Sequence, residues 1–345
     1  MTLMIREIKE AAGVIPSCAK NNAEKIAQLI DLLNKNKPKC VVLAARGTSD
    51  HAGFFAKYLI ETYVGVPVVQ ASPSVYTVYD GKMDLKDTLV LAVSQSGKAA
   101  DVLEIVKKGN ACGAVTVCIT NDENSPMAKE GKFHLFCSAG EEKSVAATKT
   151  FIAQLYLCTM IAGQWSGDKN ILDAAANAAE AINKTYELED YIENLVKRYR
   201  FITDGFVLAR GLSFPLALEA ALKIQETCYI KARGYAISDF HHGPFAMVAK
   251  DTPVVVFAVD GNVSNDTLEM IEKLKNAEAD ILMISNDKEF ADMGSASILL
   301  PSDADGILGV FAGAIAIQMF ACKLSVSRGL NPDAPRGLKK VTITK

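Results

Sequence analysis

The chain is poor in the groups that hold metals or bind polyanions. It has four histidines, and its eight cysteines are scattered without CxxC spacing, so no metal-ligand set is recognisable. Lys and Arg number 37 against 40 Asp and Glu, which leaves a net charge of -3. This balance provides no general attraction to nucleic acid or to an anionic membrane. We expect a small-molecule ligand, no metal and no other cofactor.

Signals for export and for membrane insertion are also missing. Residues 1–13 carry charges at helical spacing, where a signal peptide needs an unbroken apolar core. The longest apolar run, 307–322, is interrupted by Gln318 and is shorter than the ~20 residues of a membrane span. We expect 307–322 to form a buried core helix. The cysteines are expected to be buried thiols in a reducing cytoplasm.

Short apolar runs alternate with helical stretches along the chain, which predicts an α/β fold with parallel sheets covered on both faces. In the first half, the expected strands are 41–45, 68–70, 88–93, 115–119 and 133–137. The expected helices are 5–12, 22–33, 51–63, 99–108, 147–165 and 171–199.

The second half resembles a diverged copy of the first. Residues 43–62 align with 207–227, and residues 118–122 align with 283–287. Both matches are about 165 residues apart, the steady spacing that a tandem duplication leaves. The sequence therefore predicts two three-layer units, each a parallel sheet flanked by helices. The expected organisation is N-terminal helices (1–38), a first unit (39–165), a linking helix (166–200), a second unit (201–330) and a C-terminal tail (331–345).

A hydroxyl-rich loop, Ser94-Gln95-Ser96-Gly97, joins an expected strand to the next helix. Free N–H groups and the helix dipole attract an anion at such a helix N-terminus. A phosphate is the ligand expected at such a loop, although Ser and Gly also serve as helix caps without any ligand. Ligands of parallel sheets bind beyond the carboxyl ends of the strands, so the loop 47–49 is included in the expected site.

The second copy differs at the corresponding place. Its loop 259–262 contains Asp260, whose carboxylate would repel a phosphate, so only the first copy is expected to bind one. The second copy instead has Lys223 and Glu226, at i and i+3 on one helix face. Such a pair can divide proton transfers between neighbouring substrate atoms, or it can be a surface ion pair.

Three other stretches carry polar groups whose meaning the residues leave open. His241 and His242 precede Gly243-Pro244, where a tight turn either holds an imidazole in a cleft or forms an ordinary loop. The cationic stretch 335–342 either closes over a ligand or frays. Residues 141–149 are expected to begin a helix with acidic residues in its first turn.

Taken together, these stretches resemble one family. The motifs GTS, SQSG, VAATK, ALEAALKIQE, HHGP and PRGLKK look like those of the tandem sugar-isomerase (SIS) half of glucosamine-6-phosphate synthase and of the SIS-type glucosamine-6-phosphate deaminases. The resemblance runs from about residue 40 to the last residue. It implies that the C-terminal tail lies over the active site.

The resemblance also implies how substrate is bound. The phosphate would be held by Ser49, Ser94, Gln95 and Ser96, in loops that include Thr48. The sugar would lie near Val145.

For catalysis, the resemblance implies that Glu226 moves a proton between C1 and C2 and that His242 opens the sugar ring. Lys223 and Lys340 would lie near the substrate oxygens. The ring-opening histidine of the family comes from the partner subunit, so a homodimer is implied.

The chain departs from the synthase pattern at three positions and at its front. Ala99 stands where the synthases have a phosphate-binding Thr, Lys98 where they have an acid, and Ala147 where they often have Ser. Two hydroxyl donors are lost, and the Lys98 charge could compensate for them. The first sugar loop is already reached at Gly47, so the glutaminase domain and its ammonia source are expected to be absent.

The most direct prediction is a cytoplasmic enzyme that deaminates glucosamine 6-phosphate to fructose 6-phosphate and ammonia. Aldose-ketose isomerisation of a hexose phosphate and deglycation of a fructosamine 6-phosphate are alternatives, because one proton-transfer apparatus serves all three. A non-catalytic sugar-phosphate sensor is the alternative outside enzymes. An enzyme is favoured because mere binding does not need Glu226 and His242 together.

Overall fold

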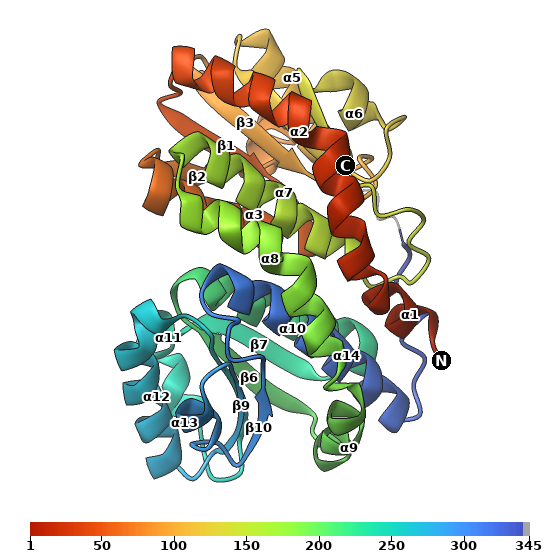
Figure 1. Ribbon diagram of the computed structural model, residues 1–345, viewed down its shortest axis with the longest axis vertical. Helices are drawn as coiled ribbons and strands as arrows, with labels where there is room; N and C mark the ends of the chain where they lie inside the picture. The colour runs from red at the N-terminus through yellow and green to blue at the C-terminus, as the bar shows by residue number, and fades with distance from the viewer. Residues whose placement is uncertain (341–345) are drawn as a thin grey trace. The chain divides into compact units, whose positions relative to one another are not determined.

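The computed structural model describes residues 1–340, which form two compact units, each built on one sheet (Figure 1). The first-sheet unit contains residues 13–142, 149–176 and 339–340. The second-sheet unit contains residues 1–12, 143–148 and 177–338. Each unit therefore combines segments that are far apart in the chain.

All strands of the first sheet are parallel, in the order β2-β1-β3-β4-β5. The expected strands are all present, with ends that differ by at most one residue. The three central strands are buried on both faces, as strands of a parallel sheet are, whereas the two edge strands are partly exposed. The strands are β1 (Cys40–Ala44), β2 (Val68–Gln70), β3 (Thr88–Val93), β4 (Val115–Thr120) and β5 (Phe133–Phe136).

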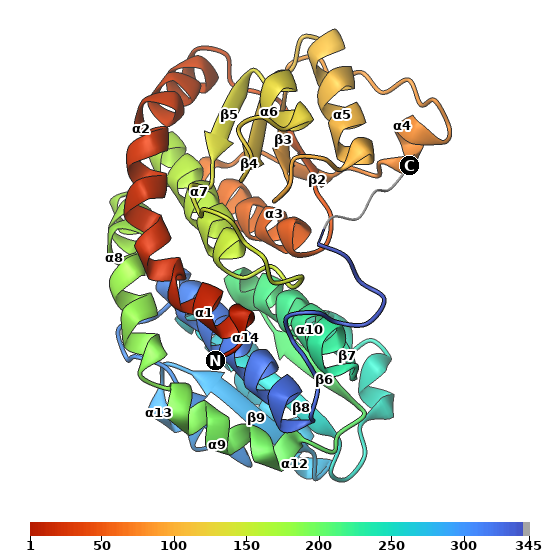
Figure 2. The same cartoon turned by 90° about the vertical axis from the view of Figure 1, so that its right-hand side faces the viewer.

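Helices cover both faces of this sheet (Figure 2). On one face, Val42 and Val90 share a buried cluster with Ile105. On the other face, Gly53 packs so closely that a Cβ there would lie 3.4 Å from Leu43 Cδ2. The first face is covered by α4 (Ser74–Thr77), α5 (Ala100–Ala111) and α6 (Pro126–Glu130), and the second by α3 (Thr48–Leu59), the π-helix η1 (Ile60–Val64) and α7 (Lys149–Ser166).

The second sheet repeats this topology. Its order is β10-β9-β8-β6-β7, again all parallel, which is the order of the first sheet read from the other edge. The predicted fold class, two duplicated three-layer α/β units, is confirmed. The strands are β6 (Asp204–Ala209), β7 (Lys231–Ala236), β8 (Pro253–Ala258), β9 (Asp280–Ser285) and β10 (Ala296–Leu299).

The helices of the second-sheet unit also form two layers. One layer, with α11, α12 and α13, packs on a cluster that includes Phe206, Val254 and Met270. The other layer contains α9, α10 and α14, and short 3-10 turns precede or follow several of these helices. The bounds are α9 (Glu189–Tyr199), η2 (Gly211–Ser213), α10 (Phe214–Cys228), α11 (Ile237–Phe240), η3 (Pro244–Met247), η4 (Gly261–Val263), α12 (Ser264–Asn276), α13 (Lys288–Ala291) and α14 (Ile307–Ser327).

The expected core helix is α14. Of the described residues, only those of α14 form a helix long and apolar enough to cross a membrane, and 89% of that stretch is buried inside the protein. A Cβ added at Gly313 would lie 2.8 Å from Leu216 Cδ1 of α10, so α14 packs closely against its neighbour. This burial is what a core helix requires.

Several predicted helix bounds are wrong. The stretches 5–12 and 22–33 belong to α1 (Leu3–Lys9) and to a long α2 (Ala11–Lys35) that continues through Pro16. The buried amide of Asn22 bonds both the N–H and the carbonyl of Phe136, each at 2.8 Å, which binds α2 to the edge strand β5. The stretch 171–199 is two helices, α8 (Lys169–Tyr186) and α9, because i to i+3 bonds at 187–188 end α8.

The predicted burial of the cysteines is confirmed for six of the eight residues. Cys40 and Cys112 are half-buried, and the other six are buried. Burial raises the pKa of Cys18, Cys118, Cys158 and Cys228 to about 12. These four thiols are therefore protonated at neutral pH.

Candidate functional site

The strand order of the first sheet reverses between β1 and β3. These strands are neighbours, with Ala44 beside Ala92, and the helices that follow them cover opposite faces of the sheet. Such a reversal in strand order opens a crevice beyond the carboxyl ends of the strands. The loops after β1 and β3 both end there, so the two expected phosphate loops lie at one place in the fold.

The loop after β3 is held by its own hydroxyls. The N–H of Gly97 donates to Ser94 Oγ at 3.2 Å, and the N–H of Lys98 donates to Ser96 Oγ at 3.3 Å. Gly97 has φ +62°, and a Cβ there would lie 2.2 Å from Ser125 Oγ. Only glycine fits this turn. Gln95 is half-buried, with its amide side chain at the same loop.

The loop after β1 leads into α3 earlier than predicted. α3 begins at Thr48 instead of residue 51, after Gly47 with φ +54°. Thr48 and Ser49 are thus buried in the first helical turn. Ser49 Oγ accepts a hydrogen bond from Gln154 Nε2 of α7 at 3.1 Å. Sequence reasoning missed Gln154, because it lies in an apolar helix with no motif around it.

The three serine hydroxyls share one property. Each accepts a hydrogen bond from an N–H group, and within residues 1–340 no protein acceptor takes the hydrogen of any of them. A hydroxyl has one donor and two acceptor sites. Ser49, Ser94 and Ser96 therefore each have a hydrogen to donate to a ligand.

The departures from the synthase pattern are visible at the start of α5. Ala99 occupies the N-cap and makes no side-chain cap hydrogen bond. Lys98, expected to compensate for the lost hydroxyls, lies 3.4 Å from Asp122 Oδ2 on the surface. Its charge is therefore shared with an acid of the protein. Ala147, in the second-sheet unit, is half-buried in an irregular segment.

In the second-sheet unit, α10 carries the predicted acid-base pair. Lys223 has no exposed side-chain area, and its Nζ bonds Glu226 Oε2 and lies 3.6 Å from Glu219 Oε1. Glu219 is equally buried, whereas 22% of the Glu226 side chain is exposed. The surface ion-pair alternative is thus wrong. The sequence analysis missed Glu219, although its i to i+4 spacing from Lys223 was readable.

The segment around Val145 is irregular, which corrects the prediction of a helix beginning at 141–149. α7 begins at Lys149, and the buried carboxylate of Glu142 caps it from outside by accepting from Thr150 N at 3.1 Å and Oγ1 at 2.9 Å. In the second-sheet unit, the buried Glu7 of α1 accepts from the N–H of Lys143 at 2.6 Å. These carboxylates satisfy the backbone, so no helix is needed there.

The described part of the C-terminal tail, up to residue 340, makes specific contacts. Asp333 accepts from the N–H groups of Leu3 and Met4, each at 2.8 Å. Arg336 stacks over the ring of Tyr229, 4.2 Å from its centre. Within the first-sheet unit, Lys340 Nζ lies 2.6 Å from Glu142 Oε2. The frayed-tail alternative does not describe these residues, and the rest of the predicted tail, 341–345, lies outside the described residues.

His242 is exposed on the turn after α11, where Gly243 adopts φ +124°. It lines a pocket of about 390 Å³, and Glu226 is not among the residues that line it. The lining residues are Arg210, Ile237, Ser238, His241, His242, Asp266, Glu269 and Lys273.

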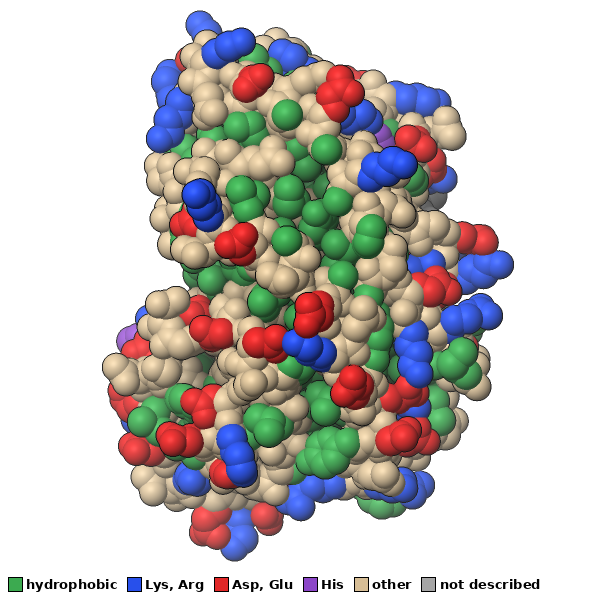
Figure 3. Space-filling view, in the orientation of Figure 1, with side chains coloured by type: hydrophobic (Ala, Val, Ile, Leu, Met, Phe, Trp, Pro, Cys, Tyr) green, Lys and Arg blue, Asp and Glu red, His purple; other side chains and the backbone are tan. Residues whose placement is uncertain are grey.

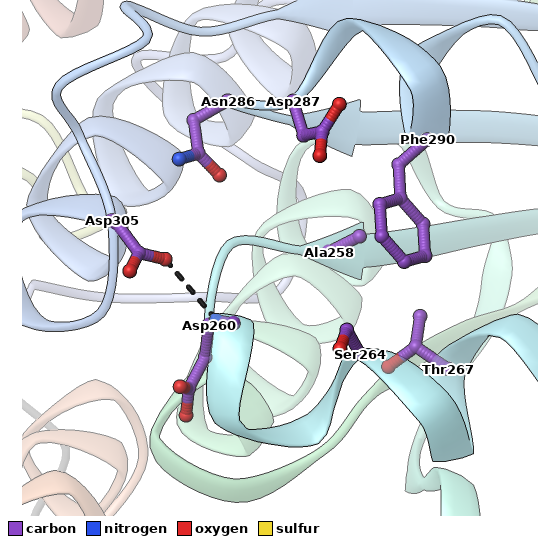
Figure 4. Close-up of a pocket in the computed structure, with 9 residues that line it drawn as sticks. Ala258, Asp260, Ser264, Thr267, Asn286, Asp287, Phe290 and Asp305 are labelled. Carbon is purple, nitrogen blue, oxygen red and sulfur yellow. Dashed lines mark hydrogen bonds between the residues drawn. The ribbon is translucent and has the colours of Figure 1, made fainter.

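One pocket of the second-sheet unit is acidic. A pocket of about 320 Å³ beyond β8 and β9 is lined by Asp260, Asp287 and Asp305, with Phe290 as an apolar wall (Figure 4). Asp305 accepts from the N–H of Gly261 at 3.2 Å. Three carboxylates disfavour a phosphate here, in keeping with the expectation from Asp260. Among the described residues, no group of His, Cys, Asp and Glu could hold a metal ion.

Acidic and basic side chains are interspersed on the face drawn in Figure 3. This face does not present the one-signed field that a nucleic-acid or membrane partner would require.

Two curated relatives of this chain carry the same protein name. The chain is 30% identical to the glutamine–fructose-6-phosphate aminotransferase (isomerizing) of Methanothermobacter thermautotrophicus over 98% of its own length and 56% of that protein. It is 34% identical to the protein of that name from Halobacterium salinarum, over 87% of this chain and 51% of that protein. The chain thus spans about half the length of the curated relatives it matches.

Solved structures agree on the fold. The C-terminal domain of glucosamine-fructose-6-phosphate aminotransferase from Francisella tularensis matches with a TM-score of 0.86 and 26% identity, over 97% of this chain and 98% of that one. Glucosamine-6-phosphate deaminase from Thermotoga maritima matches with a TM-score of 0.78 and 19% identity, over 99% of this chain and 100% of that one. The second likeness concerns the fold alone.

The family is identified by its own sequence model. The SIS domain model matches residues 32–163 and again residues 205–328. These two segments contain the two five-stranded sheets. The chain belongs to the SIS domain family and carries two SIS segments.

Proposed function

We propose that the first-sheet crevice binds the phosphate of a hexose or aminohexose 6-phosphate. Ser49, Ser94 and Ser96 would donate their hydroxyl hydrogens, and Gln95 and the first turn of α5 would donate N–H groups. The observation that carries this proposal is that three hydroxyls from two loops of this sheet each accept from an N–H group and, within residues 1–340, donate to no protein acceptor.

We further propose that the chain is an enzyme that moves protons on this sugar. Lys223 has no exposed side-chain area and lies against two carboxylates, and burying an ammonium in this way is costly to the folded state. A chemical role explains why it is present. Glu226 is the partly exposed member, so it would act as the base, while Lys223 would lie near the substrate oxygens and Val145 near the sugar.

The proposed reaction is deamination of glucosamine 6-phosphate. His242 would transfer the proton of the anomeric hydroxyl to the ring oxygen and open the ring. Glu226 would take the proton from C2 and return it to C1, while one proton of the amine passes to O1, which converts the amino aldehyde into the C2 imine of the ketose. Water would then add at C2 and ammonia would leave, giving fructose 6-phosphate.

Two features of the proposal concern the assembly. His242 lies in a pocket that Glu226 does not line, so we propose that a second copy of the chain supplies His242 to the site. Lys340, paired with Glu142, would bring its ammonium to the substrate oxygens from the tail. The working protein would then be a homodimer.

The experiment that tests the function is incubation of the purified chain with glucosamine 6-phosphate, with measurement of ammonia and fructose 6-phosphate. We expect both products in equal amounts, and a loss of at least about 100-fold in kcat for Glu226→Gln with binding retained. Ketose formation from a hexose phosphate without ammonia would favour an isomerase. Amino-acid release from a glycated substrate would favour a deglycase, and binding without any turnover would favour a sensor.

The phosphate site has its own test. Each charge-assisted hydrogen bond to phosphate contributes about 1.5–3 kcal/mol, so Ser94→Ala with Ser96→Ala should weaken binding of glucosamine 6-phosphate at least about tenfold. Binding of unphosphorylated glucosamine should not change. Equal wild-type affinity for the two sugars would refute the site.

A further inference from the structure

Gln154 is a buried polar residue at the edge of the proposed phosphate site. Only 1% of its surface is exposed, and its Nε2 donates to Ser49 Oγ at 3.1 Å. Its Oε1 is buried and has no hydrogen-bond partner in the described chain. A buried amide oxygen without a partner lowers the stability of the folded protein, so stability alone does not explain a glutamine at this position. The interaction that Gln154 does make is the hydrogen bond to Ser49.

The duplicated half of the chain provides an internal comparison. Gln318 of α14 stands about 165 residues after Gln154 and is also fully buried. Its Nε2 donates to the carbonyl of Thr148 at 3.3 Å, and not to a serine. Ser213, the counterpart of Ser49, donates its own hydroxyl hydrogen to the carbonyl of Arg210 at 2.8 Å. At these corresponding positions of the described chain, the amide-to-serine contact therefore occurs in the half with the proposed phosphate loop and not in the other half.

The direction of this hydrogen bond matters. An N–H that occupies a lone pair of Ser49 Oγ forces the hydroxyl hydrogen to point elsewhere. In Ser213 that hydrogen is used by the backbone, whereas within residues 1–340 no acceptor takes the hydrogen of Ser49. We propose that Gln154 is a positioning residue that orients the Ser49 hydroxyl as a donor to the substrate phosphate. This inference rests on the proposed phosphate site and deepens it.

The test compares Gln154→Met with Gln318→Met. Methionine has a similar length and neither donates nor accepts strongly, so both variants remove one buried amide. Dissociation constants are measured by calorimetry for glucosamine 6-phosphate and for glucosamine, and thermal midpoints report folding. We expect Gln154→Met to weaken binding of the phosphorylated sugar about three- to tenfold, as the loss of one oriented hydrogen bond does. Glucosamine binding should be unchanged, and Gln318→Met should leave the ratio of the two affinities as in the wild type.

A double-mutant cycle separates orientation from general disturbance. If Gln154 acts through Ser49, Gln154→Met should have no further effect on affinity in a Ser49→Ala background. Wild-type affinity in Gln154→Met, or losses that simply add in the double variant, would overturn the inference while leaving the phosphate site intact. A wild type that binds glucosamine and its 6-phosphate equally would overturn both. Should Gln154→Met not fold, Gln154→Leu is measured in the same cycle.

Discussion

The guanidinium of Arg46 contacts one oxygen of the buried Asp101 carboxylate with two nitrogens: Nε lies 2.8 Å and Nη2 2.7 Å from Asp101 Oδ2. Arg46 directly follows the β1 region, and Asp101 lies in the first turn of α5, so the pair joins the two loops of the crevice. The second copy repeats it about 165 residues on, where Arg210 Nε lies 2.8 Å from Asp266 Oδ2. The two pairs differ in burial: 3% of the Asp101 side chain is exposed, against 52% of Asp266.

This difference predicts unequal effects of the same substitution. Arg46→Met leaves a buried carboxylate unpaired, so we expect the free energy of unfolding to fall by about 1–3 kcal/mol. Arg210→Met removes an exposed pair and should cost less than about 1 kcal/mol. Urea denaturation measures both. The double variant Arg46→Met/Asp101→Asn should regain part of the loss, and equal costs for the two single variants would contradict the argument.

Lys223 provides a second prediction about stability. Replacing it by Met removes an ammonium that lies 3.6 Å from the buried carboxylate of Glu219, which is expected to cost about 3–5 kcal/mol. Adding Glu219→Gln should recover much of that loss, because a neutral amide is less costly to bury than a carboxylate. Chemical denaturation of the three proteins tests this, with Lys323→Met as a control, since Lys323 pairs with Glu189 and Glu193 closer to solvent. If Lys223→Met were as stable as the wild type, the prediction would be wrong, because the buried carboxylate of Glu219 would not depend on Lys223.

His134 makes stability depend on pH. Burial, with a smaller contribution from Lys25, lowers the pKa of His134 from 6.5 to about 4 against the opposing charge of Asp122. Between these values the unfolded chain binds a proton that the folded chain does not, so the free energy of unfolding should decrease as pH falls from about 6.5 to 4. His134→Gln should flatten this part of the profile of unfolding midpoint against pH. His242→Gln is the control, and a profile unchanged by His134→Gln would disprove the assignment.

The thiols are expected to react in two classes. Cys40 and Cys112 are half-buried, and the remaining six are buried, so about two thiols per chain should react quickly with a soluble disulfide reagent. All eight should react after unfolding. Cys112→Ser should reduce the fast class by one. More than two fast thiols in the native protein would mean that the buried sites open readily.

The local sequence was sufficient for the fold class and for the position of the glycine- and hydroxyl-containing loop at Ser94. Apolar runs of strand length, alternating with helical patterns, can be buried only in parallel sheets with helices on both faces. The repeat of about 165 residues then implied two such sheets. The loop at Ser94 was recognisable because a glycine and hydroxyls after a strand act through their own backbone, within a few residues.

The bounds of helices needed the tertiary structure, because distant partners decide them. α2 continues through Pro16 and is bound to β5 by Asn22, and α7 begins at Lys149, with Glu142 capping it from outside the helix. Periodicity within a segment contains no information about such partners.

The surroundings of the site were likewise decided by the fold. Gln154 contacts Ser49 across 105 residues, and Lys340 contacts Glu142 across 198. Local sequence patterns do not indicate which residues so far apart in the chain come into contact. The serines and the lysine could therefore be predicted from the sequence, but their partners could not. The sequence determined which groups can do chemistry, because side-chain type is local. Only the tertiary structure decided how they are oriented and buried, because a hydrogen bond requires two groups to meet in space.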